Sequence, residues 1–122
     1  MEIKAINEQF SVCKGISVEQ IRWTDEFCFV GKTDEELSLV CPTDSVPEDA
    51  KVCDHGWKAF RIQGELDFSL IGILSKISGI LADCGIGIFA ISTYNTDYIL
   101  TKEENFQRAL TALSEAGYTV VS

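Results

Sequence analysis

The chain has 122 residues, of which 46% are hydrophobic and 24% are charged. This composition is typical of a globular protein and excludes a largely disordered one, and no apolar run reaches the ~20 residues that span a bilayer. Nineteen acidic and ten basic side chains give a net charge of −9, which opposes binding to nucleic acid or to an anionic membrane surface.

The amino-terminal sequence and the cysteines predict a cytoplasmic protein. Residues 1–10 lack the basic and then apolar order of a secretory signal peptide. The five cysteines are widely spaced and odd in number, and with the single histidine, His55, they do not make a usual zinc set. We therefore expect reduced structural cysteines, no metal and no cofactor.

The first half of the chain predicts a β-α-β-β order. Strands are expected around 10–13, at 27–30 and at 37–41, with a turn at 33–36. Ser17 and Gln20 fit a capping box, which predicts a short helix over 18–23. Both prolines fall in the polar stretch 42–56. We interpret this stretch as a linker that ends an N-terminal lobe, residues 1–56, before a second domain, residues 57–122.

The second half predicts a β-α-β-β-α-β order. A strand over 57–62 leads through a loop into an apolar helix over about 70–84, in which Gly79 indicates close approach by a neighbour and which Gly85 ends. A strand over 86–93, a polar hairpin and a strand at 98–100 follow. Thr101 and Glu104 fit a second capping box before another helix and a last strand at 118–121. This order is that of the ferredoxin-like α+β fold, in which two helices cover one face of a sheet.

The other face of this sheet would be open. The strand over 86–93 is apolar on both sides, because Phe89 and Ile91 alternate with Ile86, Ile88 and Ala90. Either the first lobe or a second copy of the chain would cover the open face, and the sequence leaves both alternatives.

Two polar segments, each following a strand, are the candidate ligand-binding residues. At the helix start, backbone N–H groups and the positive helix end favour a carboxylate. In the hairpin, Asp97 would pair with an ammonium group. A purely structural role is the alternative in each case. The first segment would cap the helix, and the side chains of the second would hydrogen-bond to the backbone of their own turn. The candidates are Asp67, Phe68, Ser69, Leu70, Ile71 and Gly72 in the first segment, and Ser92, Thr93, Tyr94, Asn95, Thr96 and Asp97 in the second.

We expect no catalytic residues and no enzyme. Cys53, Asp54 and His55 could suggest a nucleophile and a base, but adjacent residues seldom have the mutual geometry that this chemistry needs. Motifs for a nucleophile elbow, a P-loop or a dinucleotide-binding loop do not occur in the sequence. The same element order serves RNA-binding modules, but these need a basic surface.

The segment DFSLIGILSKISGILADCGIGIFAISTYNTDYIL, residues 67–100, resembles the small tandem ACT-domain proteins related to the cytosolic arginine sensor of animals. The resemblance extends over about residues 57–117 and is fainter in FCFVGKTDEELSLVCP. It implies paired ACT modules with ligand contacts from the loop before Gly72 and from the hairpin. Asp97 matches an aspartate that contacts the ligand in the sensor, whereas Leu70 and Ile71 stand where the sensor has an acidic contact.

These features predict a cytoplasmic, non-catalytic regulatory protein with a shortened ACT-like module at 1–56 and an ACT domain at 57–122. Its expected partners are a small-molecule ligand, an amino acid bound between ACT modules, and a second copy of the chain or a regulatory protein. No nucleic acid and no membrane are expected as partners. The alternative is a protein–protein interaction module without a ligand, in which the open sheet face mediates assembly.

Overall fold

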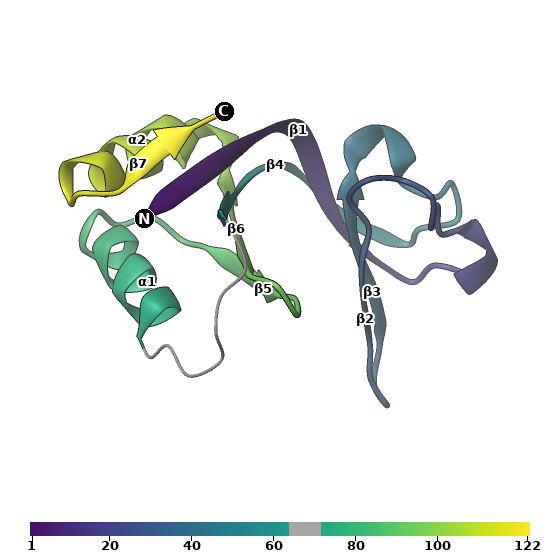
Figure 1. Ribbon diagram of the computed structural model, residues 1–122. Coiled ribbons are helices and arrows are strands. Elements are labelled where there is room, and N and C mark those ends of the chain that lie inside the picture. Colours follow the sequence, from purple (N-terminus) through teal and green to yellow (C-terminus); the bar gives the residue numbers. More distant parts are fainter. Residues whose placement is uncertain (64–71) are drawn as a thin grey trace. The chain divides into compact units, whose positions relative to one another are not determined.

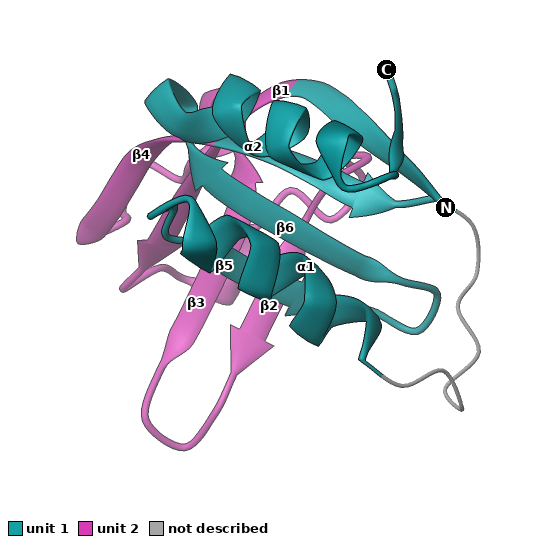
Figure 2. Ribbon diagram, turned by 90° about the vertical axis from the view of Figure 1, so that its left-hand side faces the viewer, with its two compact units in different colours: residues 1–7, 58–122 teal, residues 8–57 magenta. Residues whose placement is uncertain are grey.

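The computed structural model describes residues 1–63 and 72–122, and the chain divides into two compact units. Residues 1–7 and 58–122 form unit 1, and residues 8–57 form unit 2 (Figure 2). Two long strands, β1 (Glu2–Lys14) and β4 (Val52–Ile62), contribute to both units. The first seven residues, which the sequence analysis placed in the N-terminal lobe, therefore pack with the second half of the chain.

Unit 1 has the βαββαβ order predicted from the sequence (Figure 1). β4 is followed by α1 (Ile73–Asp83), β5 (Phe89–Ser92), β6 (Asp97–Lys102), α2 (Glu103–Glu115) and β7 (Thr119–Val121). Within this unit the strand order is β7-β1-β4-β6-β5. β1 runs parallel to β7, with Ile3 opposite Val120, and the Glu2 carbonyl accepts a hydrogen bond from the Gln63 N–H just beyond β4. The ferredoxin-like fold is thus confirmed, with the first strand of the chain added between β7 and β4.

Both helices cover one face of the unit 1 sheet (Figure 2). Each helix has an apolar stripe that is buried against the strands, because apolar residues recur at helical spacing. Fully burying one such aliphatic side chain contributes about 1.5–3 kcal/mol, so the two stripes hold the helices on the sheet. The buried core comprises Ile3, Phe60, Ile62, Ile77, Leu81, Ile86, Ile99, Phe106, Ala109, Leu110 and Leu113.

The register of β5 and β6 decides which side chains lie on the other face of the sheet. Ala90 is opposite Ile99, which belongs to the helix-covered core, and Ile91 is opposite Tyr98. Cross-strand partners share a face, and successive side chains alternate between faces. Phe89 and Ile91 therefore lie on the face away from the helices, where both are half-buried.

Two predicted capping boxes are wrong, because their hydroxyl groups have other places in the structure. Ser17 Oγ donates to Asp49 Oδ2 at 2.6 Å, and residues 18–20 form only a 3-10 turn, η1 (Val18–Gln20). Thr101 is fully buried within β6, so α2 begins two residues later at Glu103. The Ser17 hydroxyl is hydrogen-bonded to Asp49, and Thr101 is part of a strand, so neither hydroxyl caps the helix that follows it.

The structure bears differently on the predictions made for Gly79, inside α1, and Gly85, just after it. Gly85 has φ +72° directly after the C-cap, as expected for the residue that ends a helix. A Cβ atom built at Gly79 would meet no atom of residues 1–63 and 72–122 within 4 Å, so the close approach predicted at Gly79 is not made by any of these residues.

Unit 2 is a small antiparallel sheet. The hairpin of β2 (Phe29–Lys32) and β3 (Leu37–Pro42) turns where Thr33 N–H donates to the Glu36 carbonyl at 2.9 Å, which confirms the predicted turn. β3 pairs with the second part of β1, with Val12 opposite Val40. The predicted linker contains a second 3-10 turn, η2 (Thr43–Ser45), and its last residues already belong to β4. The small core of this unit comprises Ile21, Leu39 and Cys41.

Candidate functional site

The second candidate segment, residues 92–97, forms the hairpin between β5 and β6. Thr93 donates to the Thr96 carbonyl both from its backbone N–H, at 2.9 Å, and from its hydroxyl, at 3.0 Å. Ser92 Oγ donates to Asp97 Oδ1 at 2.5 Å, and the side chain of Tyr94 is 75% exposed. The hairpin is therefore bonded to itself through Ser92 and Thr93, and Asp97 is held at its base.

Thr96 connects this hairpin to the end of β4. Its side chain is only 6% exposed, and its hydroxyl donates to the carbonyl oxygen of Ile62 at 2.7 Å. Ile62 is the last residue of β4, the strand that precedes the first candidate segment in the sequence. A buried hydrogen bond thus joins the hairpin to the point where the chain leaves the sheet toward α1.

Of the first candidate segment, Gly72 is the residue that the structure describes. It is the N-cap residue of α1 with φ +81°, a left-handed conformation that favours glycine, and its carbonyl accepts from the Lys76 N–H at 2.8 Å. A Cβ atom at this position would meet no atom of the described residues within 4 Å, so the preference for glycine that the structure shows is conformational. The other predicted residues of this segment, Asp67, Phe68, Ser69, Leu70 and Ile71, lie outside the described residues.

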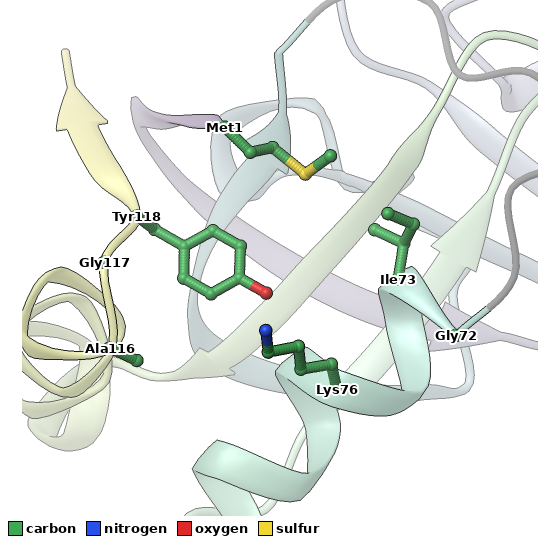
Figure 3. Close-up of a pocket in the computed structure, with 7 residues that line it drawn as sticks. All are labelled: Met1, Gly72, Ile73, Lys76, Ala116, Gly117 and Tyr118. Carbon is green, nitrogen blue, oxygen red and sulfur yellow. The ribbon is translucent and has the colours of Figure 1, made fainter.

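A pocket of about 310 Å³ adjoins Gly72 (Figure 3). The start of α1 and the end of α2 meet there, together with the first residue of the chain. The Lys76 ammonium and the Tyr118 hydroxyl point toward one another across it. The residues that line it are Met1, Gly72, Ile73, Lys76, Ala116, Gly117 and Tyr118.

Lys76 and Tyr118 are not among the binding residues predicted from the sequence. Lys76 falls within the helix predicted over about 70–84, and Tyr118 is the first residue of the strand predicted at 118–121. One signal could have found them: Lys76 lies in the first turns of one predicted helix and Tyr118 follows the end of the other, and both helices were expected on the same face of the sheet.

The adjacent residues Cys53, Asp54 and His55 do not all lie on one face of the sheet. They are consecutive in β4, so Asp54 points to the face opposite Cys53 and His55. His55 Nδ1 lies 2.6 Å from Ser11 Oγ, which is also 2.9 Å from the hydroxyl of Thr43. Ser11 is fully buried, so its hydroxyl is not accessible as a nucleophile.

The cysteines are free thiols, and two of them in unit 2 are strongly perturbed. Burial, a hydrogen bond with Cys53 and the neighbouring thiols of Cys53 and Cys41 raise the pKa of Cys13 to about 12. Burial, followed by the influence of Cys28, Asp25 and Cys53, raises the pKa of Cys41 to about 11. At neutral pH both behave as small, unreactive apolar side chains.

Metal-ligating clusters and membrane-spanning helices are both absent from the described ranges, 1–63 and 72–122. In these ranges no group of three or more histidine, cysteine, aspartate and glutamate side chains is placed to hold a metal ion. None of the helices there has the length and apolar character required to span a membrane.

Comparison with known proteins relates both the sequence and the fold to one family. The model of the ACT domain family matches residues 52–115, slightly more than half of the chain. The structure of a protein from Agobacterium tumefaciens has a TM-score of 0.84 and 30% sequence identity, covering 98% of this chain and 91% of that one.

Two more distant structures share the fold. The regulatory subunit of aspartate kinase from Thermus thermophilus, in its ligand-free form, has a TM-score of 0.67 at 11% identity, with coverage of 96% and 98% of the two chains. Aspartate kinase from Synechocystis has a TM-score of 0.70 at 18% identity, covering 99% of this chain and 27% of the kinase.

Proposed function

The chain belongs to the ACT domain family, and on that premise we propose that it is a non-catalytic regulatory protein that binds an amino acid. The proposal includes a cytoplasmic location, a functional relationship to the cytosolic arginine sensor of animals, and a ligand held by the ACT domain in the second half of the chain. A structure of similar fold is named as a regulatory subunit of aspartate kinase, which supports the regulatory part of the proposal.

The hydrogen bond from Thr96 to Ile62 is the observation that carries the proposal. It is buried and joins the hairpin, which contains Asp97, to the end of the strand from which the chain continues toward α1. A ligand that contacts both segments would therefore act on two elements that are already coupled. The ligand carboxylate would meet the start of α1, and its ammonium group would meet Asp97.

The carboxylate of Asp97 can accept further hydrogen bonds, from an ammonium group for example. One of its oxygens accepts from Ser92 Oγ, and an ionised carboxylate has about four acceptor sites in all. Ser92 would then fix the orientation of Asp97, so that binding would not have to order this side chain.

Calorimetry and thermal-shift measurements with the twenty amino acids test the proposal. A saturable response is expected, with stabilisation of about 2.7 kcal/mol when the ligand is present at a hundred times its Kd. Asp97→Asn keeps the acceptor for Ser92 and removes the charge, so it should abolish most of the ligand-induced shift. Asp34→Asn, at an exposed turn of unit 2, is the matched control. If no amino acid gives a saturable response, the proposal fails.

The second candidate function is an assembly module without a ligand. The observation that favours it is the position of Phe89 and Ile91 on the sheet face away from the helices. Ile91→Asp should then change the sedimentation coefficient of the protein, while Asp97→Asn should not. Altered assembly together with no response to any amino acid would favour this function over the first.

A further inference from the structure

The pocket between the start of α1 and the end of α2 combines the Lys76 ammonium, the Tyr118 hydroxyl and apolar walls (Figure 3). Its volume of about 310 Å³ is at the lower end of the range for small-molecule sites, which are mostly apolar with a few convergent polar groups. The described residues that line it all belong to unit 1. The pocket is therefore formed by a single compact unit.

The charge of Lys76 is not neutralised within the described part of the chain. Its ammonium forms no salt bridge or hydrogen bond with a residue of this part, and no acidic side chain is among the described residues that line the pocket. The hydroxyl of Tyr118 faces the same space. An ammonium and a phenol hydroxyl can both donate hydrogen bonds, so together they favour an anionic oxygen group.

Two carbonyls at the end of α2 already accept hydrogen bonds from the backbone that follows the helix. The N–H groups of Gly117 and Tyr118 donate to the carbonyls of Ser114 and Leu113, at 3.1 and 3.0 Å. These carbonyls at the negative end of the helix are therefore already satisfied. An amino-acid ammonium group in the pocket would be repelled by the ammonium of Lys76.

We infer that this pocket binds a small aliphatic monocarboxylate that has no amino group. The carboxylate pairs with Lys76 and accepts a hydrogen bond from Tyr118, and the aliphatic chain contacts Ile73 and Met1. This site goes beyond the proposed amino-acid function, because it selects against an ammonium group and does not use Asp97. The site lies in a protein of net charge −9, so the interaction depends on the local charge of Lys76.

Three compounds with the same carbon skeleton test the inference on the full chain: 3-methylbutanoate, its 2-amino derivative valine, and the neutral 3-methylbutanamide. Amide chemical shifts in ¹H–¹⁵N NMR spectra report both affinity and location. We expect 3-methylbutanoate to shift the amides of Ile73, Lys76 and Tyr118 in a saturable way, at least about tenfold more tightly than either of the other compounds, as for one charged hydrogen bond.

Two substitutions test the assigned groups. Lys76→Met keeps the aliphatic stem and should weaken binding of 3-methylbutanoate about tenfold or more, and Tyr118→Phe should weaken it about threefold to tenfold. Lys32→Met, at an exposed position of β2 in unit 2, should have no effect. Both substituted side chains of the pocket are at least partly exposed, and an unchanged spectrum elsewhere checks that each variant is folded.

Several results would overturn the inference: no saturable binding of 3-methylbutanoate, equal binding of the amide or of valine in this pocket, or unchanged binding by the Lys76→Met variant. The proposed amino-acid function is tested separately by the same spectra. If valine or another amino acid shifts the amides of residues 92–97 while 3-methylbutanoate leaves the pocket unaffected, the inference fails and the proposed function stands. The reverse pattern would support the inference and overturn the proposed function.

Discussion

Replacing Thr96 with valine tests whether one buried hydroxyl holds the β5–β6 hairpin to the end of β4. Valine keeps the shape of the side chain, so the change removes the hydrogen bond to Ile62 with almost no change in packing volume. Thr96 is 6% exposed and Ile62 is fully buried, so water would not readily replace the lost donor. Leaving a buried acceptor without this partner should cost about 1–3 kcal/mol.

For a chain of this length, 1 kcal/mol corresponds to about 3–6 °C in melting temperature, so Thr96→Val should lower Tm by about 3–18 °C. Amide hydrogen exchange should show faster opening at Thr93, whose N–H donates within the hairpin. Thr119→Val, at an exposed position of β7, is the control and should change stability by less than about 0.5 kcal/mol. A Thr96→Val protein with the Tm and exchange rates of the control would refute the role given to this bond.

The two glycines of α1 and the buried thiols give further predictions. Gly72→Ala should lower the denaturant midpoint by the equivalent of about 1–2 kcal/mol, because φ is +81°. Gly79→Ala should raise it by about 1 kcal/mol, because neither new Cβ meets an atom of the described residues within 4 Å and alanine is the better helix former. Equal effects of the two substitutions would contradict the conformational argument. The Cys13 thiol loses its proton near its ordinary pKa of 9.0 when unfolded but near about 12 when folded, so the unfolded chain binds fewer protons between these values and stability falls as pH rises. Cys13→Ser should make this fall shallower by up to about 1.4 kcal/mol per pH unit between pH 9.5 and 11, measured by denaturation at each pH, and identical slopes would contradict the assigned pKa.

The parts of unit 1 that could be predicted from the sequence are those whose pattern is local. The apolar stripe of α2 and the glycine after α1 appear where helical spacing and left-handed backbone preference place them. The features that were predicted wrongly or not at all depend on residues far apart in the sequence. Ser17 is drawn to Asp49, thirty-two residues away, and the pairing of β1 with β7 joins the two ends of the chain, which no local periodicity reveals.

The same distinction between local and long-range features applies to the candidate site. The hairpin at 92–97 could be located because its polar residues interrupt two apolar strands, but its bond to Ile62 spans thirty-four residues and could not be read from the sequence. Lys76 and Tyr118 are brought to one pocket only by the packing of the two helices. A single lysine on a helix and a tyrosine after a glycine do not indicate a binding site in the sequence until the packing of the helices is known.

The two proposed sites have opposite charge preferences, and this follows from the residues that each one uses. Asp97 at the base of the hairpin favours an ammonium group, and Lys76 in the pocket favours a carboxylate that lacks one. Gly72 lies at the start of α1 and is common to both, because it belongs to the first candidate segment and also lines the pocket. An amino-acid carboxylate at the start of α1 and a second carboxylate beside Lys76 would repel each other. Since coupling between sites is reciprocal, each ligand would weaken binding of the other by the same factor, and the protein would respond to the ratio of the two compounds rather than to either alone.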